Sequence, residues 1–365
     1  MRGLPLAQGF LIGVVNGFAI DASRSDPFSG KDQRVVPFQI LYPARAPGSH
    51  ALYVPDAELV IDATVKSRGW VSRVFLGQIG ALSAPWTNDA APSDRGPFPV
   101  VLYLPGVTGY MQMGSFQTSA LAARGYVVVT LNQPGVVAAA LMPDGQIIRG
   151  LTPAQATSLV APSYRQSDTP QPEGFAAALM PQHSIVPYFA QDVVTVLDRL
   201  AQINADPAHI LHGVLDLEHV GVMGMSLGAI VGAQACATEA RIGACLMMDA
   251  PVPTEVASAG LRQPALWISR PKEDQRRERD ASGGWSEEEI DAQTETINLA
   301  IANSAHSRLV TVHGFFHVDF TDLPAVQPVF GWLGQSGPTG IIEAHRQVNA
   351  LTLQFFATAF RRGGG

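Results

Sequence analysis

The chain has 365 residues, of which 47% are hydrophobic and 15% are charged, and it carries a formal net charge of −7 at pH 7. This composition supplies a large apolar core, and the acidic balance, with no basic run interleaved with aromatic residues, argues against a nucleic-acid groove. The longest apolar stretches are too short to cross a bilayer, so we expect no transmembrane segment. Residues 9–15 form an apolar run without a clear signal-peptide cleavage pattern. The sequence therefore allows two compartments: the protein is either cytoplasmic or secreted with its signal peptide removed.

Short apolar runs and helix-period patterns alternate along most of the chain. An alternating strand is predicted at residues 35–42, and continuously apolar strands, typical of strands buried on both faces, are predicted at residues 99–104, 126–131, 219–224, 243–249, 265–269 and 308–313. Apolar residues at helical spacing predict helices at residues 115–124, 186–203, 227–240, 286–304 and 341–360. This alternation is typical of an α/β protein with a mainly parallel central sheet flanked by helices, and we expect one domain over residues 1–365.

Two long segments, residues 43–97 and 134–185, fit poorly as helix or strand. The first is rich in Pro, Ser and Gly, and the second holds seven prolines and very little charge. Loops of this length in a compact domain are usually functional, so we expect both segments to cover or wall a binding site. Residues 136–142 are apolar and are interpreted as a buried wall, with a membrane-docking surface as the alternative. Residues 361–365 are expected to form a flexible tail.

The most informative motif lies in residues 220–230. An apolar strand runs into Gly224-Met225-Ser226-Leu227-Gly228 and then into an Ala-rich helix. A serine on so sharp a strand-to-helix turn needs small residues two positions before and after it, because a side chain there would collide with neighbouring backbone. The turn presents the Ser226 hydroxyl at a helix N-terminus, where the macrodipole favours developing negative charge. We interpret the motif as a nucleophile elbow; the alternative is a small-residue helix entry with an idle serine.

A serine nucleophile needs a histidine base and an acid that orients it, and in α/β-hydrolases these follow in the order Ser, acid, His, each beyond a strand end. Asp249 stands at the carboxyl end of the predicted strand at residues 243–249 and is the predicted acid, with a turn or helix cap as the alternative. A later strand end offers two histidines, His313 at the strand edge and His317 on a loop past Gly314. His317 is the predicted base because its loop can bend back over the elbow, and His313 is interpreted as structural. We expect no metal and no cofactor, since Gly314 directly after a strand argues against a helix that would align the two histidines.

Backbone N–H groups must bind the oxyanion of the tetrahedral intermediate. Leu227, directly after the serine, is one predicted donor. Val107 is the other, because it lies in a Gly-containing loop after the strand at residues 99–104. The alternative is that the glycines of this loop only close a turn.

Two further sets of residues have open interpretations. Apolar and small neighbours of the site predict a substrate pocket, with ordinary core packing as the alternative, at Thr108, Met225, Phe315 and Phe316. Cys236 and Cys245 are interpreted as buried free thiols, with a local disulfide as the alternative.

With these residues in place, the chain resembles the platelet-activating factor acetylhydrolase family of α/β-hydrolases, the monomeric plasma and intracellular type II branch. The similarity covers most of residues 10–325 and includes residues 34–43 and 97–106. Its specific signals are the spacing of 23 residues between Ser226 and Asp249 and the motif Gly314-Phe-Phe-His-Val-Asp-Phe-Thr-Asp322. The resemblance implies an α/β-hydrolase fold, and it implies that the nucleophile, acid and base are Ser226, Asp249 and His317. It also selects His317 over His313.

The motifs and the resemblance together predict a serine carboxylic-ester hydrolase that works through an acyl-enzyme. The expected substrates are short-chain or acetyl esters of small or lipid-like molecules, as the family resemblance implies. A polyester or lipase-type hydrolase and an acyltransferase with the same triad are the alternatives. A non-catalytic binding protein is disfavoured, because such proteins usually lose one member of the triad. The acyl length, the alcohol and the oligomeric state are left open.

Overall fold

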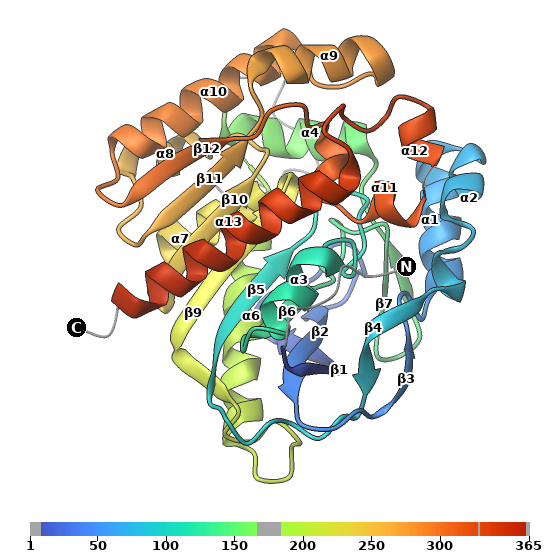
Figure 1. Ribbon diagram of the computed structural model, residues 1–365, viewed down its shortest axis with the longest axis vertical. Helices are drawn as coiled ribbons and strands as arrows, with labels where there is room; N and C mark the ends of the chain where they lie inside the picture. The colour runs from blue at the N-terminus through green and yellow to red at the C-terminus, as the bar shows by residue number, and fades with distance from the viewer. Residues whose placement is uncertain (1–8, 166–183, 328, 363–365) are drawn as a thin grey trace. The chain divides into compact units, whose positions relative to one another are not determined.

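The computed structural model describes residues 9–165, 184–327 and 329–362 (Figure 1). The chain divides into two compact units, one formed by Met1–Pro153 and Asp192–Gly221, the other by Ala154–Gln191 and Val222–Gly365. The division falls inside two helices, α4 (Pro153–Val160) and α6 (Val186–Ala205), and inside the strand β9 (Leu215–Met225). The single-domain expectation for residues 1–365 stays a prediction.

The first unit is built around a mixed sheet. Its strands are β1 (Leu11–Asp21), β2 (Arg34–Ala44), β3 (Ser49–Leu52), β4 (Ser83–Asn88), β5 (Phe98–Leu104) and β6 (Val127–Leu131), in the spatial order β5-β6-β2-β1-β4-β3, with a separate hairpin of β7 (Ala139–Leu141) and β8 (Ile147–Arg149). Its helices are α1 (Ala57–Arg68), α2 (Val71–Leu76), η1 (Ile79–Ala81) and α3 (Ser115–Ala122). The β5–β6 pair is parallel, whereas β2 runs antiparallel to both β1 and β6.

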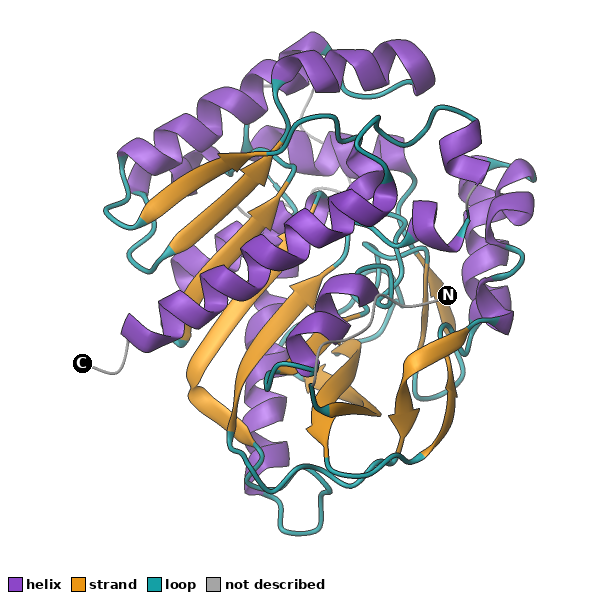
Figure 2. Cartoon of the chain, viewed as in Figure 1, coloured by secondary structure: helices purple, strands orange, loops and turns teal. Residues whose placement is uncertain are grey.

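The second unit carries parallel strands between helices. Its strands β10 (Ile242–Met248), β11 (Ala265–Ser269) and β12 (Ser307–Thr311) pair in parallel, in the order β12-β11-β10, and β9 follows β10. The helices are η2 (Ala161–Ser163), α7 (Leu227–Thr238), α8 (Thr254–Ala259), α9 (Lys272–Ser282), α10 (Glu287–Ala302), η4 (His317–Phe320), α11 (Leu323–Val326), α12 (Val329–Trp332) and α13 (Ile341–Arg362). In Figure 1, α13 runs across the front of β10 and α7 lies behind it, and Figure 2 shows the same strands between helices.

Two of the continuously apolar runs, β10 and β11, are buried on both faces, as the sequence predicts. Every residue of β11 is buried, and in β10 only Gly243 is exposed. For β12 the prediction of burial on both faces was wrong, because its residues are half-buried or exposed. This strand is the last in the order, so the sheet ends there and fewer elements cover it.

The interpretation of residues 43–97 and 134–185 as irregular was also wrong in part. The first segment contains α1, α2, β3 and β4, and the second contains β7, β8 and α4. These elements are short, and β4 is stabilised by pairing in parallel with β1, a strand some seventy residues earlier in the chain, which no local pattern reveals. Residues 166–183 of the second segment lie outside the described residues, as do residues 1–8 before the apolar run. The prediction of a flexible tail over residues 361–365 was wrong for Arg361 and Arg362, which continue α13, and residues 363–365 are outside the described residues. Among the described residues, no helix combines the length and the apolar character needed to cross a membrane.

Cys236 and Cys245 form a disulfide, so the favoured interpretation as free thiols was wrong. Cys236 lies near the end of α7, and the tight connection at residues 239–241 leads the chain back along that helix into β10, which brings the two Cα atoms to 6.5 Å. This separation lies within the range that a disulfide bridges. Gln263 Nε2 donates to the carbonyl oxygen of Cys236 (2.6 Å) beside the bond.

Candidate active site

Ser226 occupies the single residue between β9 and α7, and its backbone is left-handed (φ 57°, ψ −128°). A non-glycine residue rarely adopts this conformation, so the surrounding structure must hold it there. Ser226 N–H donates to Met248 O (3.0 Å), which ties the turn to the end of β10. A Cβ atom on Gly224 would lie 2.2 Å from Gly228 O, which is the collision that the motif predicts. The turn therefore has the geometry of a nucleophile elbow, with a half-buried serine at the N-terminus of α7.

Asp249 follows β10 directly and is fully buried. Its Oδ2 accepts hydrogen bonds from His317 Nδ1 (2.6 Å) and from Arg270 Nε (2.8 Å), and its Oδ1 accepts from Gln293 Nε2 (3.3 Å). Burial raises the pKa of Asp249, but the Arg270 charge and the His317 hydrogen bond outweigh it and hold this pKa well below its usual range. Asp249 is therefore ionised at neutral pH.

His317 is the first residue of η4, and its side chain is 23% exposed. Because Asp249 accepts from Nδ1, the neutral ring carries its proton there, and Nε2 is the nitrogen that can accept a proton. Asp319 supports the loop by accepting from Phe316 N–H (2.7 Å) and Gly337 N–H (2.8 Å) through Oδ2. The structure thus brings together two of the predicted side chains, Asp249 and His317, in the unit that also holds Ser226.

His313, the competing histidine, does not join this arrangement. Its side chain is exposed, and its carbonyl oxygen accepts from Thr339 Oγ1 (2.8 Å). Gly314, directly after it, has a positive φ of 71°, so the chain turns away from the β12 direction before it reaches His317.

The predicted pocket residues of the second unit lie in packed surroundings. Phe315 is completely buried and its ring centroid is 5.4 Å from that of Phe320. Phe316 and Met225 are also buried. This packing favours the alternative of ordinary core for all three, and their role in a pocket stays a prediction.

The predicted oxyanion donors lie in different units. Leu227 begins α7 directly after the serine, where the first N–H groups of a helix have no intrahelical acceptor. Val107 and Thr108 belong to the first unit, in the loop after β5. Thr108, which the sequence predicts for the pocket, is buried and its N–H donates to Val136 O (2.8 Å); its role in a pocket stays a prediction. The role of Val107 as second donor stays a prediction.

Three side chains around the base were not found from the sequence. Arg270 directly follows β11. Because functional groups gather at the carboxyl ends of parallel strands, this position could have identified Arg270 from the sequence. Glu278 lies on α9 and Trp285 in the short connection to α10, and neither belongs to a recognisable motif. The Trp285 ring centroid is 5.3 Å from that of His317, so a half-buried indole lies beside the imidazole of the predicted base. In the described part of the chain, no group of three or more His, Cys, Asp or Glu side chains is arranged to hold a metal ion.

No known protein-family model matches the chain. A solved structure of a ferulic acid esterase from Streptomyces cinnamoneus is similar, with a TM-score of 0.69 and 22% sequence identity, over 96% of this chain and 90% of that one. The chain has the α/β-hydrolase fold. A cold-adapted esterase from an Arctic intertidal metagenomic library matches 89% of this chain and 94% of its own, with 12% identity and a TM-score of 0.43, a likeness too weak to support a structural assignment. The fold class predicted from the sequence is confirmed.

Proposed function

We propose that the protein is a serine carboxylic-ester hydrolase. The observation that carries the proposal is the hydrogen bond of 2.6 Å between Asp249 and His317, in the same unit as a serine held on a left-handed strand-to-helix turn. A serine hydroxyl is a weak nucleophile without such a pair, and a buried aspartate with a lowered pKa is the group that stabilises an imidazolium. The structural similarity to a ferulic acid esterase supports ester hydrolysis on this fold.

In the proposed reaction, Ser226 Oγ attacks the acyl carbon of the ester while His317 Nε2 takes the hydroxyl proton. The negative charge moves to the former carbonyl oxygen, where Leu227 N–H and Val107 N–H are the expected donors. His317 then gives its proton to the leaving alcohol, and the acyl group remains on Ser226. Water, deprotonated by the same Nε2, releases the acid and restores the serine. Asp249 holds the ring in the required tautomer throughout.

Short-chain or acetyl esters are the proposed substrates, as the resemblance to platelet-activating factor acetylhydrolases implies. A second candidate is an ester of an aromatic acid such as ferulic acid, the substrate class in the name of the similar structure. Trp285 favours it, because an exposed part of an indole beside the base offers a stacking surface for an aromatic ring.

The test is hydrolysis of p-nitrophenyl esters from acetate to palmitate, with methyl ferulate as the aromatic substrate and methanol added in one series as an acyl acceptor. Ser226→Ala is expected to lower kcat at least about a thousandfold, since the nucleophile is lost. Ser158→Ala, at an exposed position of α4, is the matched control. Full activity in Ser226→Ala would overturn the proposal. A preference for the palmitate ester would instead indicate a lipase or polymer-surface enzyme. Transfer of the acyl group to methanol in preference to water would indicate an acyltransferase.

A further inference from the structure

Two carboxylates of α9 hold the loop that carries the base. Asp274 Oδ2 accepts from Gly314 N–H (2.6 Å), and Glu278 Oε1 accepts from His317 N–H (3.0 Å). The two acids are four residues apart and therefore lie on one face of the helix. Both are buried, which is unusual for carboxylates unless they are paired or hydrogen-bonded.

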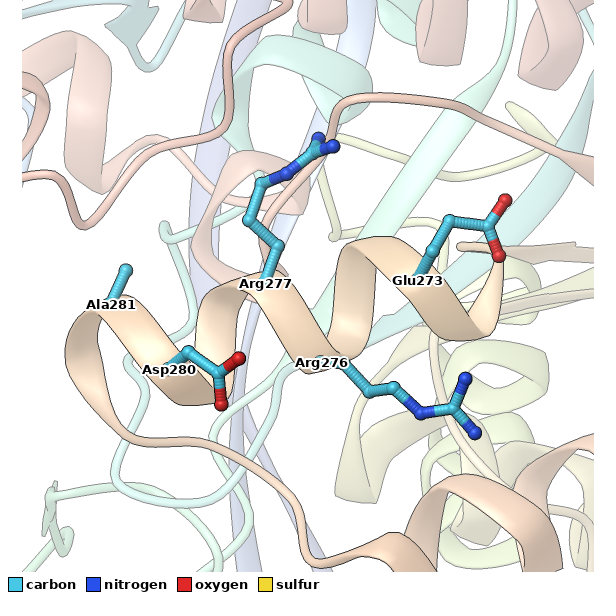
Figure 3. A pocket seen from close by; sticks show the side chains of 5 residues that line it. All are labelled: Glu273, Arg276, Arg277, Asp280 and Ala281. Carbon is cyan, nitrogen blue, oxygen red and sulfur yellow. The ribbon is translucent and has the colours of Figure 1, made fainter.

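Most other side chains of α9 are charged and at least partly exposed, whereas the uncharged Gln275 is buried. A pocket on the exposed surface of this helix is lined by Glu273, Arg276, Arg277, Asp280 and Ala281, whose side chains Figure 3 shows. Arg276 forms an ion pair with Glu287 at the start of α10, an exposed contact that links the two helices. The inward and outward faces of α9 thus have separate roles, and only the inward face reaches the base.

Glu278 differs from Asp274 in the use of its second oxygen. Glu278 Oε2 accepts from an Arg270 Nη atom (2.5 Å), and Arg270 Nε donates to Asp249 Oδ2 (2.8 Å). The Arg270 and Asp249 side chains are 1% and 0% exposed, so this contact is almost completely removed from water. Asp274 instead pairs with Arg277, whose side chain is 56% exposed. One continuous set of contacts therefore joins Glu278, Arg270, Asp249 and His317, and Glu278 closes it by binding the backbone of His317.

The charges of this set explain why Glu278 matters. Arg270 alone would cancel the charge of Asp249, which the imidazolium of the transition state needs as a partner. Two carboxylates and one guanidinium leave one net negative charge instead. Charge interactions between such closely spaced, water-excluded groups are stronger than on the surface. Two other acids approach the loop, Asp274 and Asp319, and both accept from backbone N–H groups. Asp319 also interacts with the charge of Arg270, but no described hydrogen bond joins either acid to Arg270.

The geometry points to Glu278 as a positioning residue of the triad: it balances the charge of Arg270 and anchors the backbone of His317. This inference rests on the proposed function, because it concerns the same Ser226, Asp249 and His317. Glu278 itself is not expected to touch the substrate, so its effect should appear in kcat and in the pH profile and not in KM.

The test compares Glu278→Gln with Asp274→Asn, the same chemical change one helical turn away. In Glu278→Gln the net charge of the set becomes zero, so kcat is expected to fall about tenfold or more with KM little changed. The acidic limb of the kcat/KM profile is expected to move to lower pH, because the protonated ring has lost a negative neighbour. Asp274→Asn changes only an anchor of the loop, so it is expected to lower kcat less and to leave this limb in place. Glu278→Asp keeps the negative charge, so the acidic limb of its kcat/KM profile should stay at the wild-type pH even if the shorter side chain lowers kcat.

Three outcomes would overturn the inference. The first is a Glu278→Gln variant with wild-type kcat and a wild-type pH profile. The second is an equal loss of kcat in Glu278→Gln and Asp274→Asn with no shift of the acidic limb. The third is a shift of the acidic limb in Glu278→Asp as large as that in Glu278→Gln. Thermal unfolding of each variant identifies losses of activity that come from a destabilised fold alone. If Glu278→Gln does not fold, the comparison of Glu278→Asp with Asp274→Asn decides.

Ser226→Ala separates the role proposed for Glu278 from the proposed function. Activity in that variant overturns the proposed function, whereas an inactive Ser226→Ala with an unaffected Glu278→Gln overturns only the role of Glu278.

Discussion

Ser226 and Asp249 share an unusual backbone. In the residues that the structure describes, only four non-glycine residues have a left-handed φ, and these are Asp89, Thr108, Ser226 and Asp249. Three of the four are positions that the sequence predicts for the site. Such conformations cost free energy and persist only where the surroundings enforce them, and they cluster at functional sites. For Ser226 the enforcement is visible in the bond to Met248 O and in the close approach of Gly224 to Gly228.

Gly224→Ala is expected to damage the elbow, because the added methyl group would lie 2.2 Å from Gly228 O and 2.7 Å from Ala229 N. These are backbone atoms that cannot move without displacing Ser226, so the free energy of unfolding should fall by about 1–3 kcal/mol and ester hydrolysis should be largely lost. Thermal unfolding and kcat measure the two effects. Gly331→Ala is the control, since no atom lies within 4 Å of the position that its methyl group would take and no positive φ opposes the change. Equal stability of the two variants would contradict this account of the turn.

At the scale of elements, the groups of the candidate site follow the ends of neighbouring strands. Ser226 follows β9, Asp249 follows β10 and Arg270 follows β11, while the loop of His317 follows β12. Parallel strands end at the same edge of a sheet, so side chains distant in sequence meet there. The packing of α7 against β10 sets the position of the first two groups, and the Cys236–Cys245 bond joins these same elements.

Removing this disulfide is expected to lower the free energy of unfolding by about 2–3 kcal/mol, because the bond reduces the conformational entropy of the unfolded chain. The double variant Cys236→Ala, Cys245→Ala, compared with the oxidised protein by urea unfolding, measures the effect. Alkylation of the denatured, unreduced protein is the direct check, since the chain has only two cysteines. Two modified thiols would contradict the bridge and restore the interpretation that the sequence favoured.

At the scale of the whole molecule, buried titratable groups make stability depend on pH. In the first unit, burial raises the pKa of Asp192, but its pairs with Arg34 and Arg24 outweigh this and keep the pKa below the usual value. In the second unit, burial lowers the pKa of His345 to about 4, and its Nε2–H donates to Thr321 O (2.9 Å). Acid therefore weakens both units, the first by protonating a paired carboxylate and the second also by charging a buried imidazole.

The His345 effect has a defined window and sign. Because the unfolded chain binds this proton near pH 6.5 and the folded chain only near pH 4, the free energy of unfolding should fall by about 3 kcal/mol as the pH falls through that window. His345→Gln removes the titration, so its pH dependence between 6.5 and 4 should be flatter. Urea unfolding at several pH values measures this, with His306→Gln at an exposed position as the control. The same slope in wild type and His345→Gln would contradict the prediction.

The sequence by itself determined the α/β class, the position of most long strands and helices, and the serine turn, because these depend on local periodicity and on the steric needs of a few adjacent residues. It also offered the strand-end positions at which Asp249 and two histidines stand. It also favoured His317 over His313, and the tertiary structure supplied the physical reason: the turn at Gly314 and the carboxylates of α9 direct His317 to Asp249 and leave His313 exposed. Tertiary structure alone decided the disulfide, the pairing of β4 with β1 and the contact of Glu278 with Arg270. Each of these depends on groups that packing brings together from separate elements, and hydrophobic pattern carries no information about such distances.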